Sequence, residues 1–140
     1  MKRIAVVGWG IRDIDRSVLD FALRKKIIAE EAVSLAGYDT VLLAVPVRAA
    51  ISALTEEIFA DGALVADVCG VKKAPEDAVY VFPRNYRYIG LHPMAGKETS
   101  GIASADADLF SGANLVVTVC PQTRESAKRE ISEFAKALGF

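Results

Sequence analysis

The sequence predicts an α/β fold in which helices lie on both faces of a mostly parallel sheet. Short apolar runs rich in β-branched residues are typical of strands buried on both faces. Amphipathic stretches with apolar residues at helical spacing separate most of these runs. Strands that alternate with helices favour parallel pairing, because the helix carries the chain back across the sheet. With 140 residues, we expect one domain that comprises residues 1–140.

The elements follow from the same patterns in chain order. Apolar runs predict five strands, at 3–8, 39–46, 63–70, 86–93 and 113–121. Helical spacing of apolar residues predicts three helices, at 17–37, 47–62 and 123–140. Asp15 or Ser17 is available as the N-cap of the first helix. Prolines and charges interrupt residues 72–85, which predicts a loop there.

The composition excludes several classes of protein. A hydrophobic content of 52% with 25% charged residues is typical of a soluble globular protein. The net charge of −1 gives no basic surface for nucleic acid. No apolar stretch approaches the ~18 residues that cross a bilayer, and the first residues lack the pattern of a signal peptide. Cys69 and Cys120 form neither a disulfide framework nor a metal cluster. We therefore expect a cytoplasmic protein without a metal site, a nucleic-acid partner or a membrane partner.

Glycines, prolines and chemically active side chains gather where the predicted strands end. The first four strands are followed by Gly8-Trp9-Gly10, by Val45-Pro46, by Asp67-Val68-Cys69-Gly70-Val71-Lys72 and by His92-Pro93-Met94. Ligands of parallel α/β sheets bind beyond the carboxyl ends of the strands. We therefore expect a binding site at this edge of the sheet.

The stretch VVGWGIRDID, residues 6–15, starts like a dinucleotide site. A Gly-x-Gly turn after a buried strand lets the backbone approach a pyrophosphate, as in a Rossmann-like domain. The full fingerprint has a third glycine, whereas position 13 is Asp. This signal is weak on its own, and an ordinary strand and turn would have the same sequence.

Each polar candidate at this edge has a functional and a structural interpretation. His92 is the sole histidine, and histidine ordinarily titrates near neutral pH, so it is a candidate general base. It could equally be a structural histidine at a strand end. Lys72 and Lys73 could bind an anionic substrate or form a solvated surface pair. Lys97 and Glu98 could likewise be a surface pair, which contributes little to stability when exposed.

Three motifs sharpen these alternatives. The segments YDTVLLAVP (38–46), DVCGVKK (67–73) and YIGLHPMAGKETSGIASADADLFSGANLVVTV (88–119) resemble the prephenate/arogenate dehydrogenase family of tyrosine biosynthesis. The most specific part is His-Pro-Met-Ala-Gly-Lys-Glu-Thr-Ser-Gly. The resemblance covers nearly all 140 residues, but only the nucleotide-binding half of the family.

The resemblance implies an NAD-dependent oxidative decarboxylation of prephenate or arogenate. The matched His92 would act as the general base. The residues implied on the substrate side are Glu98, Gly70 and Lys97. Those implied at the cofactor are Gly8, Trp9, Gly10, Ile11, Asp15, Val45, Pro46 and Asp67. An acidic side chain at the ribose would favour NAD over its 2′-phosphorylated form.

The sequence departs from the family pattern in three places. Gly70 stands where the family usually has Ser. The family's helical domain, which forms the dimer and binds the substrate carboxylates, is absent from the 140 residues. One helix–strand unit near the N-terminus is also missing. Either Asp15 is the ribose-binding acid, or residues 17–26 are the family's first helix and the second strand is deleted. A sheet edge left uncovered needs protection, so we expect a homodimer or a separate helical domain.

These departures keep a second hypothesis open. The chain could be a non-catalytic remnant of the family that binds a nucleotide or a partner. Related Rossmann families, such as 3-hydroxy acid dehydrogenases, share Gly-x-Gly and the AVP motif but lack His-Pro-Met, and rank third.

Overall fold

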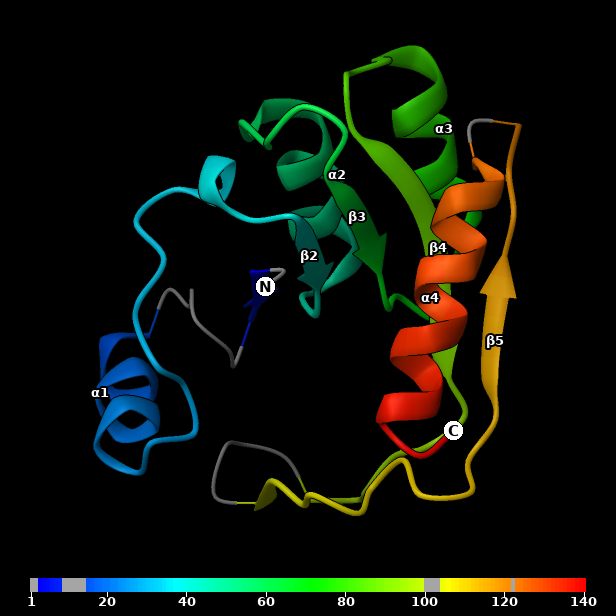
Figure 1. Cartoon of the computed structure of the whole chain (residues 1–140). Helices are drawn as coiled ribbons and strands as arrows, with labels where there is room; N and C mark the ends of the chain where they lie inside the picture. The colour runs from blue at the N-terminus through cyan, green and yellow to red at the C-terminus, as the bar shows by residue number, and fades with distance from the viewer. Residues whose placement is uncertain (1–2, 9–14, 100–103, 122) are drawn as a thin grey trace.

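The computed structural model describes residues 3–8, 15–99, 104–121 and 123–140. Five strands form one sheet in the order β1-β2-β3-β4-β5 (Figure 1). Strands β1 to β4 are parallel to one another, and β5 is antiparallel to β4. Their bounds are β1 Ile4–Val7, β2 Thr40–Leu43, β3 Leu64–Asp67, β4 Arg87–Pro93 and β5 Leu115–Thr118. The predicted mostly parallel sheet is thus confirmed, with shorter strands than the apolar runs.

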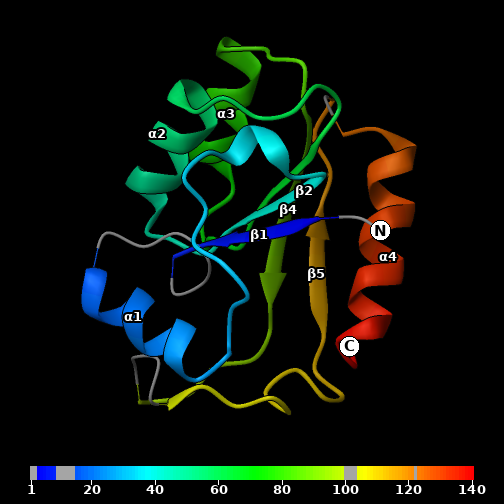
Figure 2. The ribbon, with the colours of Figure 1, turned by 60° about the vertical axis from the view of Figure 1, so that its left-hand side comes forward.

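Helices cover both faces of the sheet, as predicted (Figures 1 and 2). Helices α2 (Val47–Glu56) and α3 (Lys73–Val81) lie on one face, and α4 (Glu125–Ala137) lies on the other. Each face has its own core, since Leu54 and Val79 pack in one cluster and Ile131 in the second. Strands β2 and β3 are buried along their whole length, which explains why they read as continuous apolar runs.

The connection between β1 and β2 differs from the prediction. The helix expected over 17–37 is only α1 (Arg16–Arg24), followed by an irregular segment and the short 3-10 helix η1 (Leu35–Gly37). Lys26 adopts a left-handed backbone conformation with φ 54°, which ends the helical path. Beyond it, Ala32 and Leu35 are buried in the same core cluster as Ala5 of β1. Tertiary burial therefore overrides the helical spacing seen in the sequence.

Strand β1 lies at an edge of the sheet. In the common Rossmann strand order the first strand is internal, so this position agrees with the predicted loss of one helix–strand unit. Residues 27–34 pass on the outer side of β1, and the segment crosses in front of this strand in Figure 2 (Figures 1 and 2). Arg3 anchors this segment through an ion pair with Glu30 at 2.6 Å. The irregular segment thus takes a place beside β1 without pairing as a strand.

The connections from β2 to β3 and from β3 to β4 also differ from the prediction. Residues 72–85, predicted as a loop, contain α3. Pro75 lies in the first turn of this helix, where its missing N–H leaves no helical bond unmade. Helix α2 ends at Glu56 rather than at residue 62.

Both cysteines are free thiols; Cys69 is buried and Cys120 is partly buried. Within the described ranges, no helix has the length and apolar character that would let it cross a membrane.

Candidate functional site

The carboxyl ends of β1 to β4 meet in a continuous row of contacts, which begins at Gly8. This glycine follows β1 with φ +119°. A Cβ atom at this position would lie 2.3 Å from the carbonyl oxygen of Ala44, which follows β2. The Ala44 N–H donates to the Val7 carbonyl at 2.8 Å and holds the two backbones together. Only glycine fits this close approach of the backbones at the ends of β1 and β2.

The second contact of the row joins β2 to β3. The thiol of Cys69 donates to the carbonyl oxygen of Val45 at 3.7 Å. Burial, together with the nearby Asp67 carboxylate, raises the pKa of Cys69 to about 11. The thiol therefore keeps its proton at neutral pH and acts as a donor. Pro46 is exposed at the start of α2, directly after this contact.

The third contact joins β3 to β4 and involves the sole histidine. A Cβ atom on Gly70 would lie 3.7 Å from Cε1 of His92, an ordinary van der Waals distance. The Nδ1 atom of His92, which is bonded to Cε1, is buried and has no hydrogen-bond partner among the described residues. The structure therefore brings together Gly70 and His92, which the sequence placed on separate strands. A hydroxyl on residue 70 would be in a position to reach the ring.

A buried ion pair lies beneath this contact. Asp67 is completely buried, and its Oδ1 atom receives a bond of 2.6 Å from the Lys72 ammonium. Its other oxygen accepts from the hydroxyl of Tyr88 at 2.6 Å. The Cys69 N–H completes the set at 2.9 Å. Burial and the Asp67 carboxylate raise the pKa of Tyr88 far above its ordinary value, so the phenol remains a donor.

These contacts bear on two of the sequence-based interpretations. Lys72 is neither a solvated surface lysine nor an open anion site, because it is paired with Asp67. Lys73 pairs with Asp77 on the surface of α3. The role of Asp67 at the cofactor stays a prediction, and the structure gives its carboxylate protein partners.

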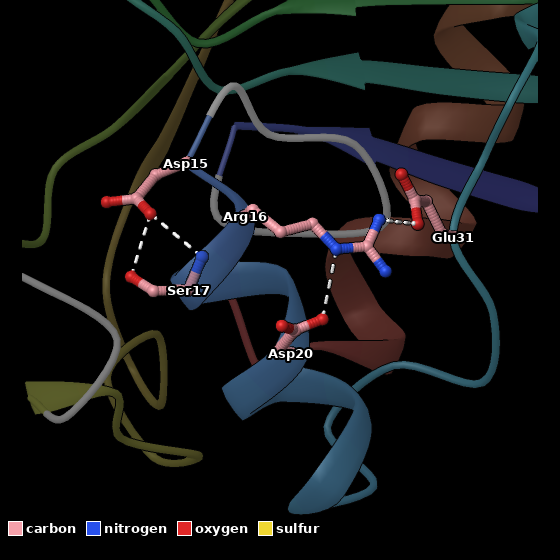
Figure 3. Close-up of polar contacts among 5 residues, drawn as sticks. All are labelled: Asp15, Arg16, Ser17, Asp20 and Glu31. Carbon is pink, nitrogen blue, oxygen red and sulfur yellow. Dashed lines mark hydrogen bonds and ion pairs between the residues drawn. The ribbon is translucent and has the colours of Figure 1, made fainter.

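Asp15 lies at the N-terminus of α1 (Figure 3). Its carboxylate accepts from the hydroxyl of Ser17 at 2.7 Å and from the Ser17 N–H at 2.9 Å. These bonds hold the pKa of Asp15 below its ordinary value, so it is ionised at neutral pH. The next residue, Arg16, pairs with Asp20 on the same helix at 3.1 Å and joins α1 to the returning segment through Glu31 at 2.5 Å (Figure 3). Asp15 is confirmed as a helix cap, and its contact with a ribose stays a prediction.

The remaining predicted site residues are less well defined by the structure. Lys97 forms an ion pair with Asp106 at 2.6 Å, and Glu98 is exposed on the same loop after β4. Neither bonds to His92 in the part of the chain that the structure describes. Trp9, Gly10 and Ile11, together with Asp13, lie outside the described residues.

Comparison with known proteins agrees with this geometry. The sequence model of one family, described as "Prephenate dehydrogenase, nucleotide-binding domain", matches residues 6–139. This chain belongs to the prephenate dehydrogenase family. The prephenate dehydrogenase of Bacillus subtilis (strain 168) is 34% identical over 102 residues, which cover 69% of this chain and 27% of the relative. That of Lactococcus lactis subsp. cremoris (strain MG1363) is 28% identical over 165 positions, covering 99% of this chain and 45% of the relative.

Solved structures of the family have the same fold. The crystal structure of prephenate dehydrogenase from A. aeolicus in complex with hydroxyphenyl propionate and NAD+ superposes with a TM-score of 0.80 at 25% identity. The superposition covers 99% of this chain and 48% of the A. aeolicus chain. This chain therefore spans less than half the length of the prephenate dehydrogenases named here.

The alignment with the Lactococcus relative also bears on the missing unit. It spans 165 positions, whereas this chain has 140 residues, so at least 25 positions have no counterpart here. This number of unmatched positions is enough for one helix–strand unit, because a parallel crossover needs a dozen or more residues.

Sequence analysis missed two residues that shape this site, Tyr88 and Gly90. A Cβ atom on Gly90 would lie 3.1 Å from Cδ of Lys72 and 3.6 Å from Oδ2 of Asp67. The signal was present in the alternation of β4, because residues 88, 90 and 92 lie on one face of a strand. The alternation therefore predicts that Tyr88 and Gly90 lie on the same side of the strand as His92.

Proposed function

We propose that this chain is the NAD-binding part of a prephenate dehydrogenase, acting in the oxidative decarboxylation of prephenate or arogenate. The observation that carries the proposal is the continuous row from Gly8 through Val45 and Gly70 to His92. The row joins a bare backbone turn, suited to a dinucleotide, to a histidine in the loop motif most specific to the family. Both halves of a dehydrogenase site therefore have candidates on the same edge of the sheet.

The residues at the start of the row fit a dinucleotide. Gly8 carries no side chain, and a glycine in the turn after a strand lets a pyrophosphate approach the backbone closely. Val45 and Pro46 follow β2 at the start of α2, where unpaired helix N–H groups favour an anion. The ionised Asp15 suits the hydroxyls of a ribose. The A. aeolicus relative, solved with NAD+, supports the choice of NAD. When bound, NAD accepts the hydride that the substrate releases.

His92 supplies the proton chemistry at the other end of the row. The substrate hydroxyl gives its proton, or a hydrogen bond, to the imidazole while hydride leaves the carbon that bears it. Loss of carbon dioxide then makes the ring aromatic, which drives the reaction. Gly70 lies close to His92, on the side proposed for the substrate, and the exposed Glu98 and Lys97 lie on the loop that follows His92. A homodimer or a separate helical domain would complete the pocket.

The proposal is tested by following NADH absorbance. The chain is mixed with NAD and prephenate or arogenate, in the presence of the C-terminal half of a full-length family member. We expect NADH formation that falls at least about 100-fold in His92→Asn, because a general base typically contributes 10²–10⁴-fold. Absence of NADH with both substrates, while NAD still binds, would favour a non-catalytic nucleotide-binding protein.

A further inference from the structure

Three residues on one face of β4 contact the turn that follows β3. Side chains alternate along a strand, so residues 88, 90 and 92 point to the same side. Tyr88 donates to the Asp67 carboxylate, Gly90 faces the Lys72 stem, and His92 lies where a Cβ atom on Gly70 would meet it at 3.7 Å. One face of one strand therefore faces the start, the end and the middle of the segment 67–72.

The segment 67–72 is fixed at both of its ends by a single carboxylate. Asp67 accepts from the Cys69 N–H at 2.9 Å and from the Lys72 ammonium at 2.6 Å. Lys72 also donates to the Asp67 carbonyl oxygen at 3.3 Å, which closes the segment on itself. Gly70 lies between these two attachments and is the residue that meets His92.

Burial makes this arrangement costly to disturb. The Asp67 side chain is 0% exposed and the Lys72 side chain only 14%. Removal of either partner would leave the other charge unpaired and shielded from water, which is strongly destabilising. Gly90 is part of the same fit, because a side chain there would meet Cδ of Lys72 at 3.1 Å. The position of the turn is therefore set by the ion pair, by the Tyr88 hydroxyl and by the space at Gly90.

We propose that Asp67, Lys72, Tyr88 and Gly90 are positioning residues that hold the 68–71 turn against the imidazole of His92. They act through the turn and do not touch the reacting atoms. The alternative is that the cluster only stabilises the fold, as the Arg87–Glu130 ion pair does where it joins β4 to α4 at 3.0 Å. The bearing of the cluster on catalysis rests on the proposed function, whereas its effect on His92 can be measured without cofactor or substrate.

The experiment uses the fact that the chain contains one histidine. The full-length chain is treated with diethyl pyrocarbonate, which acylates imidazole nitrogens, and the modification rate of the His92 peptide is measured by mass spectrometry. Hydrogen exchange of the Cys69 N–H reports on the turn itself. Tyr88→Phe removes only the hydroxyl that bonds Asp67, and Gly90→Ala leaves all hydrogen-bonding groups in place but crowds Lys72.

Tyr86→Phe is the matched control. Tyr86 is also buried and its hydroxyl also donates one bond, to the Leu54 carbonyl at 3.0 Å, but this bond does not involve the turn. We expect Tyr88→Phe to speed both the His92 modification and the Cys69 exchange by roughly two- to tenfold, the change that loss of one hydrogen bond produces in a local opening equilibrium. Gly90→Ala should change the rates in the same direction, and Tyr86→Phe should leave them at the wild-type values.

The proposal is overturned if Tyr88→Phe and Gly90→Ala both leave His92 at the wild-type rate. It is also overturned if Tyr86→Phe accelerates modification as much as Tyr88→Phe, because the effect would then be general loosening. If the rates respond as expected but no NADH forms with the C-terminal half supplied, positioning of His92 stands and the proposed function fails.

Discussion

Replacement of Gly8 by alanine tests the geometry at the start of the site. The added Cβ atom would lie 2.3 Å from the Ala44 carbonyl oxygen and 3.0 Å from its carbon. Both are backbone atoms, held by the pairing of β1 with β2, and cannot rotate away. The new side chain must therefore push apart the two strand ends that form the proposed cofactor site.

Two costs add in this variant. An L-residue with a left-handed backbone costs about 1–2 kcal/mol, and Gly8 has φ +119°. Overpacking of a well-packed region costs about 1–3 kcal/mol more. The free energy of unfolding should thus fall by roughly 2–5 kcal/mol.

Gly62 provides a matched control for the first of these costs. It has φ +72°, and a Cβ atom there would meet nothing within 4 Å. Gly62→Ala should therefore lose only the backbone contribution of about 1–2 kcal/mol. Urea unfolding of the two variants, fitted with a common slope, measures the difference directly. Equal losses in Gly8→Ala and Gly62→Ala would refute the close approach at Ala44.

Three further predictions concern other residues of the site. Gly70→Ser should change the free energy of unfolding by less than about 0.5 kcal/mol, because the added Cβ meets His92 at an ordinary distance. The NMR signals of the His92 ring should shift, because the new hydroxyl bonds Nδ1. Unshifted signals would contradict this proximity. The free energy of unfolding should decline as pH rises from 9.0 through about 11, because the folded state holds the Cys69 proton where the unfolded chain loses it. The urea midpoint of Cys69→Ala should decline less than that of the wild type over this range. An equal decline would count against burial of the thiol. The NMR signal of the Ser17 amide should titrate with a midpoint below 3.8, the ordinary pKa of an Asp carboxyl, because the cap is present above the lowered pKa of Asp15 and is lost as pH falls through it. Asp15→Asn should abolish this titration. Its persistence would assign the titration to another group.

The sequence predicted the strands better than their connections. The runs at β2 and β3 are apolar because both faces are covered, so their identity depends on local residues alone. The path of residues 27–34 depends instead on contacts with β1 and on the ion pair between Arg3 and Glu30, which are far apart in the chain. From the sequence alone, Pro75 predicts an interruption of helical structure. Its place in the first turn of α3, where proline is tolerated, is clear only once the start of that helix is known.

The site shows the same division between local and long-range information. Topology alone predicted that Gly8, Val45, Gly70 and His92 would lie on one edge, and the contacts among them agree. The partners of Asp67 could not be predicted, because Tyr88 reaches it from the neighbouring strand and Lys72 folds back from the start of α3. The sequence shows a charged residue at a strand end, but it does not show whether that residue binds a ligand or another side chain of the protein.

Calorimetric titration of the chain with NAD tests the central claim most directly, with the 2′-phosphorylated cofactor titrated in parallel. We expect saturable binding of NAD in the micromolar range and weaker binding of the 2′-phosphorylated form, because the acidic side chain of Asp15 disfavours the extra phosphate. Binding should persist in Gly62→Ala, whose substitution lies away from the site. Absence of heat with NAD, or equal affinity for the two cofactors, would contradict the dinucleotide site built from Gly8 and Asp15.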